Sequence, residues 1–398
     1  MIYILLTLCA LFVLYIIFES MCKKMGDCDL KVNDIKEKQL RLADNEILLT
    51  FTVPFENRGK QQAIVIDGLL RLEPEGNKYN DFIISSQIIN PELPLYHDNY
   101  WEAFLVKPGK KVILKGSVSI KHKDGKAVYR NELPEEMYVE LYYKYYGRNP
   151  IIYERKEFLI KPEDLEVVSG EMPVVKEEAS PPSPRKPVDE AIKTIPIKTH
   201  ILRETDGLMD VLNKYVIPLS QEGDVVAIAE SVIAILQGRA VYIETIKPGY
   251  WATRLNRFFQ QDASLSSPYS LEMAIREVGL WRILISFTVG SLGKFIGRKG
   301  DFYRLAGRPA ATIDDPPGTM PPFDKYVVLG PKDPQKVSEE IKAKTGLDAT
   351  VVDANDLGKV DVLGSTLKDR EIIVKALKHN PQGNADEQTP IVLIRPPK

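Results

Sequence analysis

The chain has 398 residues, of which 44% are hydrophobic and 27% charged, so most of it can bury a core in two or three domains. Fifty-three basic and 55 acidic residues give a formal net charge of −2, which argues against a nucleic-acid binder held mainly by phosphate contacts. Three cysteines, all within the first thirty residues, exclude a disulfide-stapled scaffold and a zinc ribbon.

The N-terminus is the most apolar part of the sequence. Residues 2–18 contain no charged residue and no proline, and as a helix they would extend about 25 Å, the short end of a membrane span. No basic region precedes them and no small-x-small cleavage pattern follows, so we favour an uncleaved anchor over a signal peptide. Lys23 and Lys24 follow the run directly, which places the rest of the chain in the cytoplasm by the positive-inside rule. We therefore predict a single-pass membrane helix, residues 1–24.

Residues 30–168 are typical of an antiparallel β-sandwich of immunoglobulin-like shape. Runs rich in β-branched and aromatic residues alternate with turn formers. The expected strands are 46–53, 62–72, 81–89, 111–120, 136–146 and 151–160. We interpret His97, His122 and the tyrosines within 138–146 as core and strand-face residues rather than as a ligand site. The expected role is a spacer or an interaction module, whose protein partner the sequence does not identify.

Residues 169–192 are rich in Pro, Ser, Glu and Lys and read as a flexible linker. After it, residues 193–398 alternate strands and helices, which predicts an α+β domain with a mixed sheet flanked by helices. The expected strands are 225–231, 240–246, 326–331, 350–356 and 390–397, and the expected helices are 249–261, 270–279 and 333–346. We interpret the apolar stretch 283–297 as a buried strand and turn, with a membrane contact as the alternative.

Acidic residues mark the candidate chemistry of this domain. Asp314 lies in a proline-locked loop, Asp353 and Asp356 follow a predicted strand, and Glu230 lies near the end of another. Carboxylates in such loops suit Mg²⁺ or Mn²⁺, which prefer oxygen ligands and usually bridge one or two carboxylates to substrate phosphates. Asp also favours turns for local reasons, so spacing alone leaves both interpretations open.

A basic, glycine-rich turn at 293–300 is the second candidate. Its cations Lys294, Arg298 and Lys299, together with backbone N–H groups, are suited to holding a phosphate. The alternative is a solvated basic turn without a ligand.

Four segments of the C-terminal half resemble the coenzyme F420-0:L-glutamate ligase, or γ-glutamyl ligase, family, and they come in the family's order. They are 223–239, which contains a Glu-x-Val-x-x-x-x-x-Gly-Arg pattern, 329–346, 351–358 and 387–396. The resemblance covers about residues 199–398.

The resemblance implies a ligase that joins an acceptor carboxylate to the amine of L-glutamate. In this family GTP phosphorylates the carboxylate to an acyl phosphate, Mg²⁺ or Mn²⁺ assists, and a homodimer is expected. The resemblance, with the spacing above, makes Asp314, Asp353, Asp356 and Gln382 the candidate metal ligands. It makes Glu230 and Arg239 candidate nucleotide residues, to which the basic turn adds Lys294, Arg298 and Lys299 as candidate phosphate residues. It assigns no catalytic residue.

Three positions depart from the family pattern. Pro316 and Pro317 replace a Ser-Asn pair, Ala354 replaces a Thr, and Gly358-Lys359 stands where Gly-Arg is expected. These departures imply an acceptor other than the deazaflavin, or a membrane-tethered scaffold whose ligase-like domain binds without catalysing. A third hypothesis is a regulatory module that binds phosphate through the basic turn without a metal.

Overall fold

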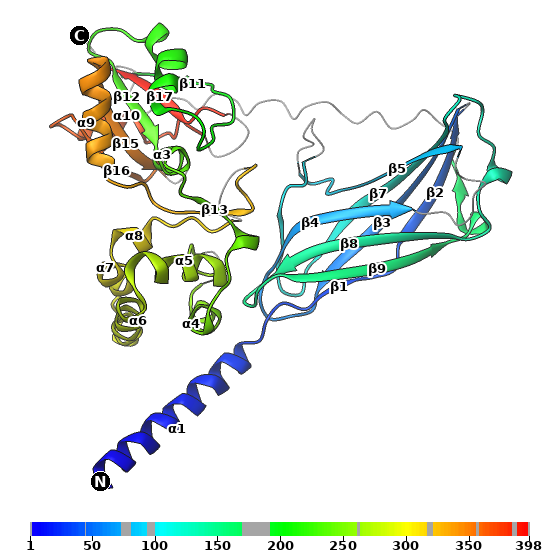
Figure 1. Ribbon diagram of the computed structural model, residues 1–398, viewed down its shortest axis with the longest axis horizontal. Helices are drawn as coiled ribbons and strands as arrows, with labels where there is room; N and C mark the ends of the chain where they lie inside the picture. The colour runs from blue at the N-terminus through cyan, green and yellow to red at the C-terminus, as the bar shows by residue number, and fades with distance from the viewer. Residues whose placement is uncertain are drawn as a thin grey trace. The chain divides into compact units, whose positions relative to one another are not determined.

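Figure 1 shows a computed structural model of the chain, which describes residues 2–43, 45–72, 81–93, 100–168, 192–260, 263–316, 321–355, 358–383 and 388–396. The side chains of residues 2–9 and 11 lie outside this description. The chain forms two compact units. Unit 1 is Met1–Glu178 with Pro248–Pro268, and unit 2 is Ala179–Lys247 with Tyr269–Lys398. Residues 248–268 thus group with unit 1, although the sequence analysis placed them in the C-terminal domain.

Unit 1 consists of the helix α1 (Ile2–Met25), a β-sandwich and the 248–268 segment. One sheet has the order β10 (Glu166–Val167), β2 (Lys36–Ala43), β3 (Glu46–Asn57), β7 (Lys111–His122) and β5 (Phe82–Ile89), with β1 (Leu30–Val32) beside β3. The other has the order β6 (Phe104–Val106), β4 (Ala63–Leu72), β8 (Met137–Tyr146) and β9 (Ile152–Ile160). The pairing is antiparallel except between β10 and β2. The predicted strands and the sandwich are confirmed, whereas the immunoglobulin-like shape stays a prediction.

Alternating side chains of the two sheets form one core. Leu49 and Phe51 of β3 belong to the same buried cluster as Val139 and Leu141 of β8, with polar neighbours between them. Among the tyrosines of β8, those at 143, 145 and 146 are buried and those at 138 and 142 lie on the exposed face. His97 lies outside the described residues.

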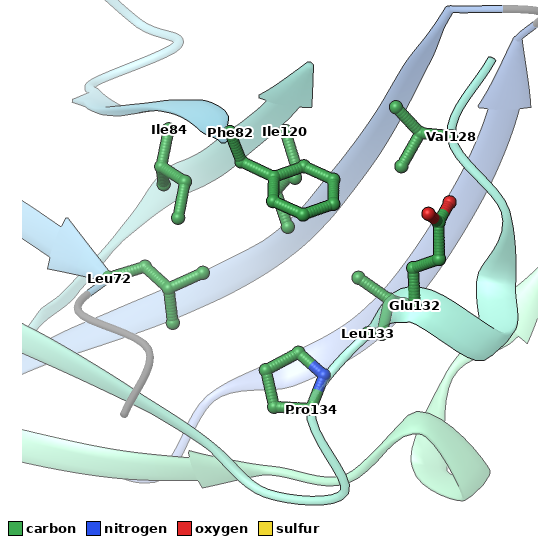
Figure 2. Close-up of a pocket in the computed structure, with 8 residues that line it drawn as sticks. All are labelled: Leu72, Phe82, Ile84, Ile120, Val128, Glu132, Leu133 and Pro134. Atoms are coloured by element: carbon green, nitrogen blue, oxygen red, sulfur yellow. The ribbon is translucent and has the colours of Figure 1, made fainter. Parts of the chain in front are cut away.

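A small pocket opens in the sandwich (Figure 2). It is lined by Leu72, Phe82, Ile84, Ile120, Val128, Glu132, Leu133 and Pro134. Its volume is about 10 Å³, room for roughly one water molecule. Its one carboxylate, that of Glu132, already accepts a hydrogen bond of 2.6 Å from the N–H of Tyr129. This pocket therefore offers no site for a substrate.

Arg148 fixes the 248–268 segment to the sandwich. Its buried guanidinium donates to the carbonyl oxygens of Asn256, Phe259 and Ser266, at 2.7, 3.0 and 2.5 Å. The side-chain amide of Asn256 donates back to the Arg148 carbonyl at 2.9 Å. The segment itself contains α4 (Tyr250–Leu255) and a 3₁₀ turn at Asn256–Phe258, close to the predicted helix.

A mixed five-stranded sheet forms the centre of unit 2. Its order is β11 (Lys193–Ile197), β17 (Ile391–Arg395), β12 (Val225–Ala229), β15 (Asp348–Ala354) and β16 (Val360–Ser365). Only β12 and β15 are parallel; the other neighbours are antiparallel. The mixed sheet predicted from the sequence is therefore confirmed.

Helices cover both faces of this sheet. The helix α9 (Pro334–Thr345) packs on one face, where Ile341 meets Val226 and Val351. The helix α10 (Glu371–Leu377) packs on the other face. A short helix α2 (Leu208–Val211), continued by a π-helical turn over Leu212–Val216, joins the α9 side. Successive strand residues point to opposite faces, so the wholly apolar run of β12 is buried on both.

Shorter elements complete unit 2. The helix α3 (Glu230–Leu236) follows β12, and β13 (Ala240–Tyr242) pairs with β14 (Tyr326–Val328). The predicted strand 240–246 ends early, because Ile243–Thr245 forms a 3₁₀ turn. Between β13 and β14 lie α5 (Pro268–Val278, whose first residue belongs to unit 1), α6 (Leu280–Phe295), α7 (Asp301–Ala306) and α8 (Arg308–Ala311).

The prediction of a buried strand and turn over 283–297 is wrong, because this stretch forms most of α6. Gly290 and Gly293 do not interrupt the helix but face α7. A Cβ at Gly290 would lie only 2.9 Å from the Cβ of Phe302, and one at Gly293 would lie 2.3 Å from the carboxylate of Asp301. The glycines thus allow two helices to approach closely.

Among the described residues, no helix by itself combines the length and the hydropathy of a membrane span. Within the described residues, α5 and α6 taken together are long and apolar enough, but their axes are bent by 114° at the junction.

Candidate active site

Three acids lie at one edge of the unit 2 sheet. In the parallel pair β12 and β15, the last two residues that pair are Ala229 and Val352. Glu230 and Asp353 come directly after them, so the two acids lie on neighbouring strands at the same end of the sheet. On the next strand Asp361 lies directly opposite Asp353. Side chains opposite each other in an antiparallel pair are about 5 Å apart at Cβ, so these carboxylates repel each other unless something compensates.

A fourth acid, Asp314, is brought to the cluster by the small sheet. Its N–H donates to the carbonyl of Val328 at 2.8 Å, and the N–H of Val328 donates to the Asp314 carbonyl at 3.2 Å. Val328 packs against Ile235 of α3, the helix that begins at Glu230. The adjacent Asp315 is buried and accepts a 2.5 Å hydrogen bond from the hydroxyl of Ser270, so it supports the loop instead.

Burial and mutual repulsion raise the pKa values of three carboxyl groups in the cluster. Burial, followed by the charges of Asp353, Asp314 and Asp361, raises the pKa of Glu230 to about 8. Burial, followed by Asp353 and Asp315, raises the pKa of Asp314 to about 7. Burial also raises the pKa of Asp353. The Oε2 atom of Glu230 is buried without a hydrogen-bond partner among the described residues.

Two exposed cations lie beside these acids. Arg308, the first residue of α8, contacts both carboxylate oxygens of Asp361 at 3.1 and 3.3 Å, and its charge favours ionised Glu230. Lys359 favours ionised Asp353. Sequence reasoning missed Arg308, for which no pattern gave a signal. It noted Lys359 only as a departure from the family.

Of two further predicted site residues, Gln382 lies near the acidic cluster and Arg239 makes its contacts elsewhere. The amide of Gln382 donates to the carbonyl of Pro390 at 2.9 Å, and the same oxygen accepts from the N–H of Ala229 at 3.0 Å. Gln382 therefore lies next to the end of β12 and so near Glu230. The guanidinium of Arg239 instead binds the Gly330 carbonyl and the Glu277 carboxylate, at 2.6 and 2.7 Å, and ties β14 to α5.

The basic turn is a separate feature. Lys294, Arg298 and Lys299 are exposed at the end of α6, and Arg298 pairs with Asp301 at 3.4 Å. In the described part of the chain, the interactions of these three cations lie within 293–304. Asp356 lies outside the described residues. The structure thus brings Glu230, Asp314 and Asp353 together with Gln382 nearby, but not the basic turn.

The donor set fits a hard divalent cation. It offers carboxylates and a carboxamide, with one buried oxygen unpaired and two carboxyl groups whose pKa values are raised by burial and by neighbouring carboxylates. No three His, Cys, Asp or Glu side chains of the described residues converge closely enough to hold an ion by themselves. Mg²⁺ usually takes one or two carboxylates, keeps several waters and binds substrate phosphates, so full protein coordination is not required.

The comparison with protein families identifies this region. Residues 196–367 match the family described as F420-0:gamma-glutamyl ligase, which confirms the resemblance of the C-terminal half. The match includes Glu230, Asp314, Asp353 and Asp361. No curated protein matches the chain.

The similar solved structures share little sequence with the chain. They include the GAE domain of GGA2p from Saccharomyces cerevisiae, with 10% identity, coverage of 34% of this chain and 91% of that one, and a TM-score of 0.20. The GAE domain of yeast GGA1 is 9% identical, the match covers 34% of this chain and 90% of that one, and the TM-score is 0.18. A putative lipoprotein, ycdA, from Bacillus subtilis has 13% identity, 34% and 37% coverage and a TM-score of 0.18.

Proposed function

We propose that unit 2 is a GTP- and divalent-metal-dependent ligase that forms an amide between an acceptor carboxylate and L-glutamate. The observation that carries the proposal is the acidic cluster of Glu230, Asp314, Asp353 and Asp361, because it lies inside the region matched to a ligase family. The unpaired oxygen of Glu230 and the raised pKa values support a cation there.

The reaction has two steps. A carboxylate oxygen of the acceptor attacks the γ-phosphorus of GTP, and GDP leaves. The amine nitrogen of glutamate then attacks the acyl carbon, inorganic phosphate leaves and the amide forms. The departures at Pro316, Pro317 and Ala354 leave the acceptor open, and we propose a carboxylate other than the deazaflavin as one alternative.

The residues in and beside the cluster divide into cation ligands and phosphate-binding residues in this proposal. Asp314, Asp353, Asp356 and Gln382 would hold Mg²⁺ or Mn²⁺, which when bound neutralises charge on the nucleotide phosphates. Arg308 and Lys359, exposed beside the acids, can pair with phosphate oxygens. The Lys294, Arg298 and Lys299 turn is no longer needed for that purpose.

Glu230 is suited to move a proton. The ammonium group of glutamate must lose a proton before its nitrogen can attack. The buried Oε2 atom of Glu230 has no hydrogen-bond partner among the described residues, so this oxygen can accept a proton. We assign Glu230 as the acceptor of that proton.

Nucleotide binding by the full chain in detergent tests the proposal. Isothermal titration with GTP should show binding that requires Mn²⁺, and Asp353→Asn should weaken it at least tenfold. Asp210→Asn, on the exposed side of α2, is the matched control and should bind as the wild type does. A folded chain that binds no GTP with Mn²⁺ present would reject the ligase.

A non-catalytic scaffold is the second candidate. Ala354 and the Pro316-Pro317 pair favour it, because they remove polar side chains that the family carries beside the acids. It predicts that Asp353→Asn changes neither partner binding nor cellular phenotype.

We also propose that residues 2–18 anchor the chain in a membrane, with the remaining residues in the cytoplasm. Side chains 12–17 are 48–61% exposed around the whole helix, as a lipid-facing segment requires. From Phe18 onward α1 instead packs on α4. The ring of Phe18 lies 6.3 Å from that of Trp251, and Glu19 accepts a 2.6 Å hydrogen bond from Tyr250. Tyr and Trp favour the membrane interface, so α4 would lie there. Resistance of the full chain to alkaline extraction from membranes tests the anchor.

A further inference from the structure

The outer face of α6 is an exposed apolar stripe. It consists of Trp281, Ile285, Val289, Leu292, Phe295 and Ile296. The spacing of three and four residues places these side chains on one side of the helix. Trp281 at one end is 76% exposed and Phe295 at the other is 90% exposed. A row of large apolar side chains this exposed indicates a binding surface.

The opposite face of α6 is already occupied. Ile283, Ser286 and Gly293 are buried, and Gly290 lies against Phe302 of the neighbouring α7 (Figure 1). This packing fixes the rotation of α6 and directs the stripe away from its own unit. The exposure of the stripe is therefore built into the fold.

Positive charge surrounds one end of the stripe. Residues 294–304 contain four cations, Lys294, Arg298, Lys299 and Arg304, and a single acid, Asp301. All four cations are exposed, and Asp301 is buried where it pairs with two of them. The basic turn thus has a net charge of +3 beside an apolar surface.

We propose that α6 lies in the surface of an anionic lipid bilayer, with the stripe in the headgroup and upper acyl region and the basic turn on lipid phosphates. An apolar face with aromatic residues, next to Lys and Arg, is typical of interfacial membrane helices. The net charge of +3 favours an anionic lipid surface over an uncharged protein surface. This contact is additional to the anchor proposed for α1, and it does not depend on the ligase activity.

The helix lies on the bilayer and does not cross it. Sixteen residues extend about 24 Å, which is shorter than the hydrocarbon core of about 30 Å. The face packed on α7 also stays inside the protein. The 114° bend between α5 and α6 likewise prevents the pair from forming one continuous span.

Fluorescence of Trp281 tests the contact in the full chain. The protein is reconstituted into vesicles of phosphatidylcholine with phosphatidylserine, with and without acyl-chain bromination. The emission of Trp281 is obtained as the difference between the wild type and Trp281→Phe, which removes the contributions of the other tryptophans. We expect brominated lipids to reduce this emission at least twofold, and vesicles without phosphatidylserine to reduce it clearly less.

Variants separate the stripe from the anchor. Leu292→Glu and Phe295→Glu together should abolish the quenching of Trp281, while the protein stays in the vesicle through α1. Val374→Glu, at an exposed apolar position of α10, should leave the quenching unchanged. Trp281 emission that brominated lipids leave unchanged would overturn the proposal. Equal quenching in neutral and anionic vesicles would also overturn it, as would burial of Trp281 by a second copy of the chain, seen as concentration-dependent dimers in detergent that the Leu292→Glu and Phe295→Glu double variant no longer forms.

Discussion

Replacing Glu230 by Gln should stabilise unit 2 at neutral pH when no divalent cation is bound. The substitution keeps the size of the side chain and removes its titration. The ordinary pKa of 4.5 is raised to about 8 in the folded protein, so at pH 7 the folded chain holds a proton that the unfolded chain has lost. A raised pKa of an acid therefore lowers stability as the pH rises from 4.5 towards 8.

The gain in stability follows from the distance between the ordinary pKa of 4.5 and the pH of the measurement. Each pH unit above the ordinary pKa is worth about 1.4 kcal/mol, which gives an upper bound of about 3.5 kcal/mol at pH 7. Glu230 is half-buried, so solvent screens part of this energy, and we expect a gain of about 2 kcal/mol. For a unit of roughly 200 residues this corresponds to a Tm increase of about 4 to 8 °C.

Calorimetric unfolding of the full chain with a chelator present measures this shift. The gain of Glu230→Gln should grow as the pH increases from about 5 to 8, and Mn²⁺ should remove it because the cation stabilises the wild type. Glu371→Gln, at an exposed acid of α10, should change the Tm little at any pH. A Glu230→Gln variant that is less stable than the wild type at pH 7, or whose gain does not depend on pH, would refute the reasoning.

Three further predictions concern charge and packing. Asp224→Asn should destabilise unit 2 by about 2 kcal/mol, because buried Asp224 accepts hydrogen bonds of 2.8 and 2.7 Å from Arg395. Burial alone would raise the pKa of Asp224, but Arg395 and the nearby backbone hold it below its ordinary value. The stabilisation of unit 2 by ionised Asp224 is therefore complete above about pH 4 and is lost in stronger acid. Unfolding curves at a series of pH values would show this loss. Arg148→Met should destabilise unit 1 by about 3 kcal/mol and speed hydrogen exchange in the segment that Arg148 holds, since three carbonyl groups lose their donor. Mn²⁺ binding should strengthen as the pH rises through 7 to 8 and release protons from Glu230 and Asp314, measured by calorimetry in buffers of different ionisation enthalpy.

Much of the fold could be predicted, because long elements repeat their pattern. The six predicted strands of the sandwich are eight to twelve residues long, and their alternation of apolar and polar residues can be recognised in the sequence. The strands β1, β6 and β10 have only two or three residues, too few for a period to be recognised. They form because neighbouring strands offer a free edge, which is a tertiary effect.

The error at α6 has a physical cause. A wholly apolar run with glycines fits a buried strand and a helix equally well when only its composition is considered. Gly290 and Gly293 act as packing positions toward α7, and that partner is not visible from the run itself. The exposed stripe was hidden for the same reason, since a sequence gives no sign of which apolar side chains remain uncovered.

Three acids of the site could be predicted, but the fourth, Asp361, and the compensating cations could not. Glu230 and Asp353 follow apolar runs, which predicts their position near strand ends, and the prolines after Asp314 predict a loop. Asp361 lies on β16, a strand that the sequence analysis did not identify. Arg308 is one of many cations in exposed loops, and only the fold places it beside Asp361.

A crystal of the full chain soaked with GTP and Mn²⁺ tests the central claim most directly. Anomalous scattering should locate Mn²⁺ between Asp314 and Asp353, with the nucleotide phosphates on the side of Arg308 and Lys359. Manganese and nucleotide bound elsewhere, or an acidic cluster that stays empty at saturating concentrations of both, would contradict the account.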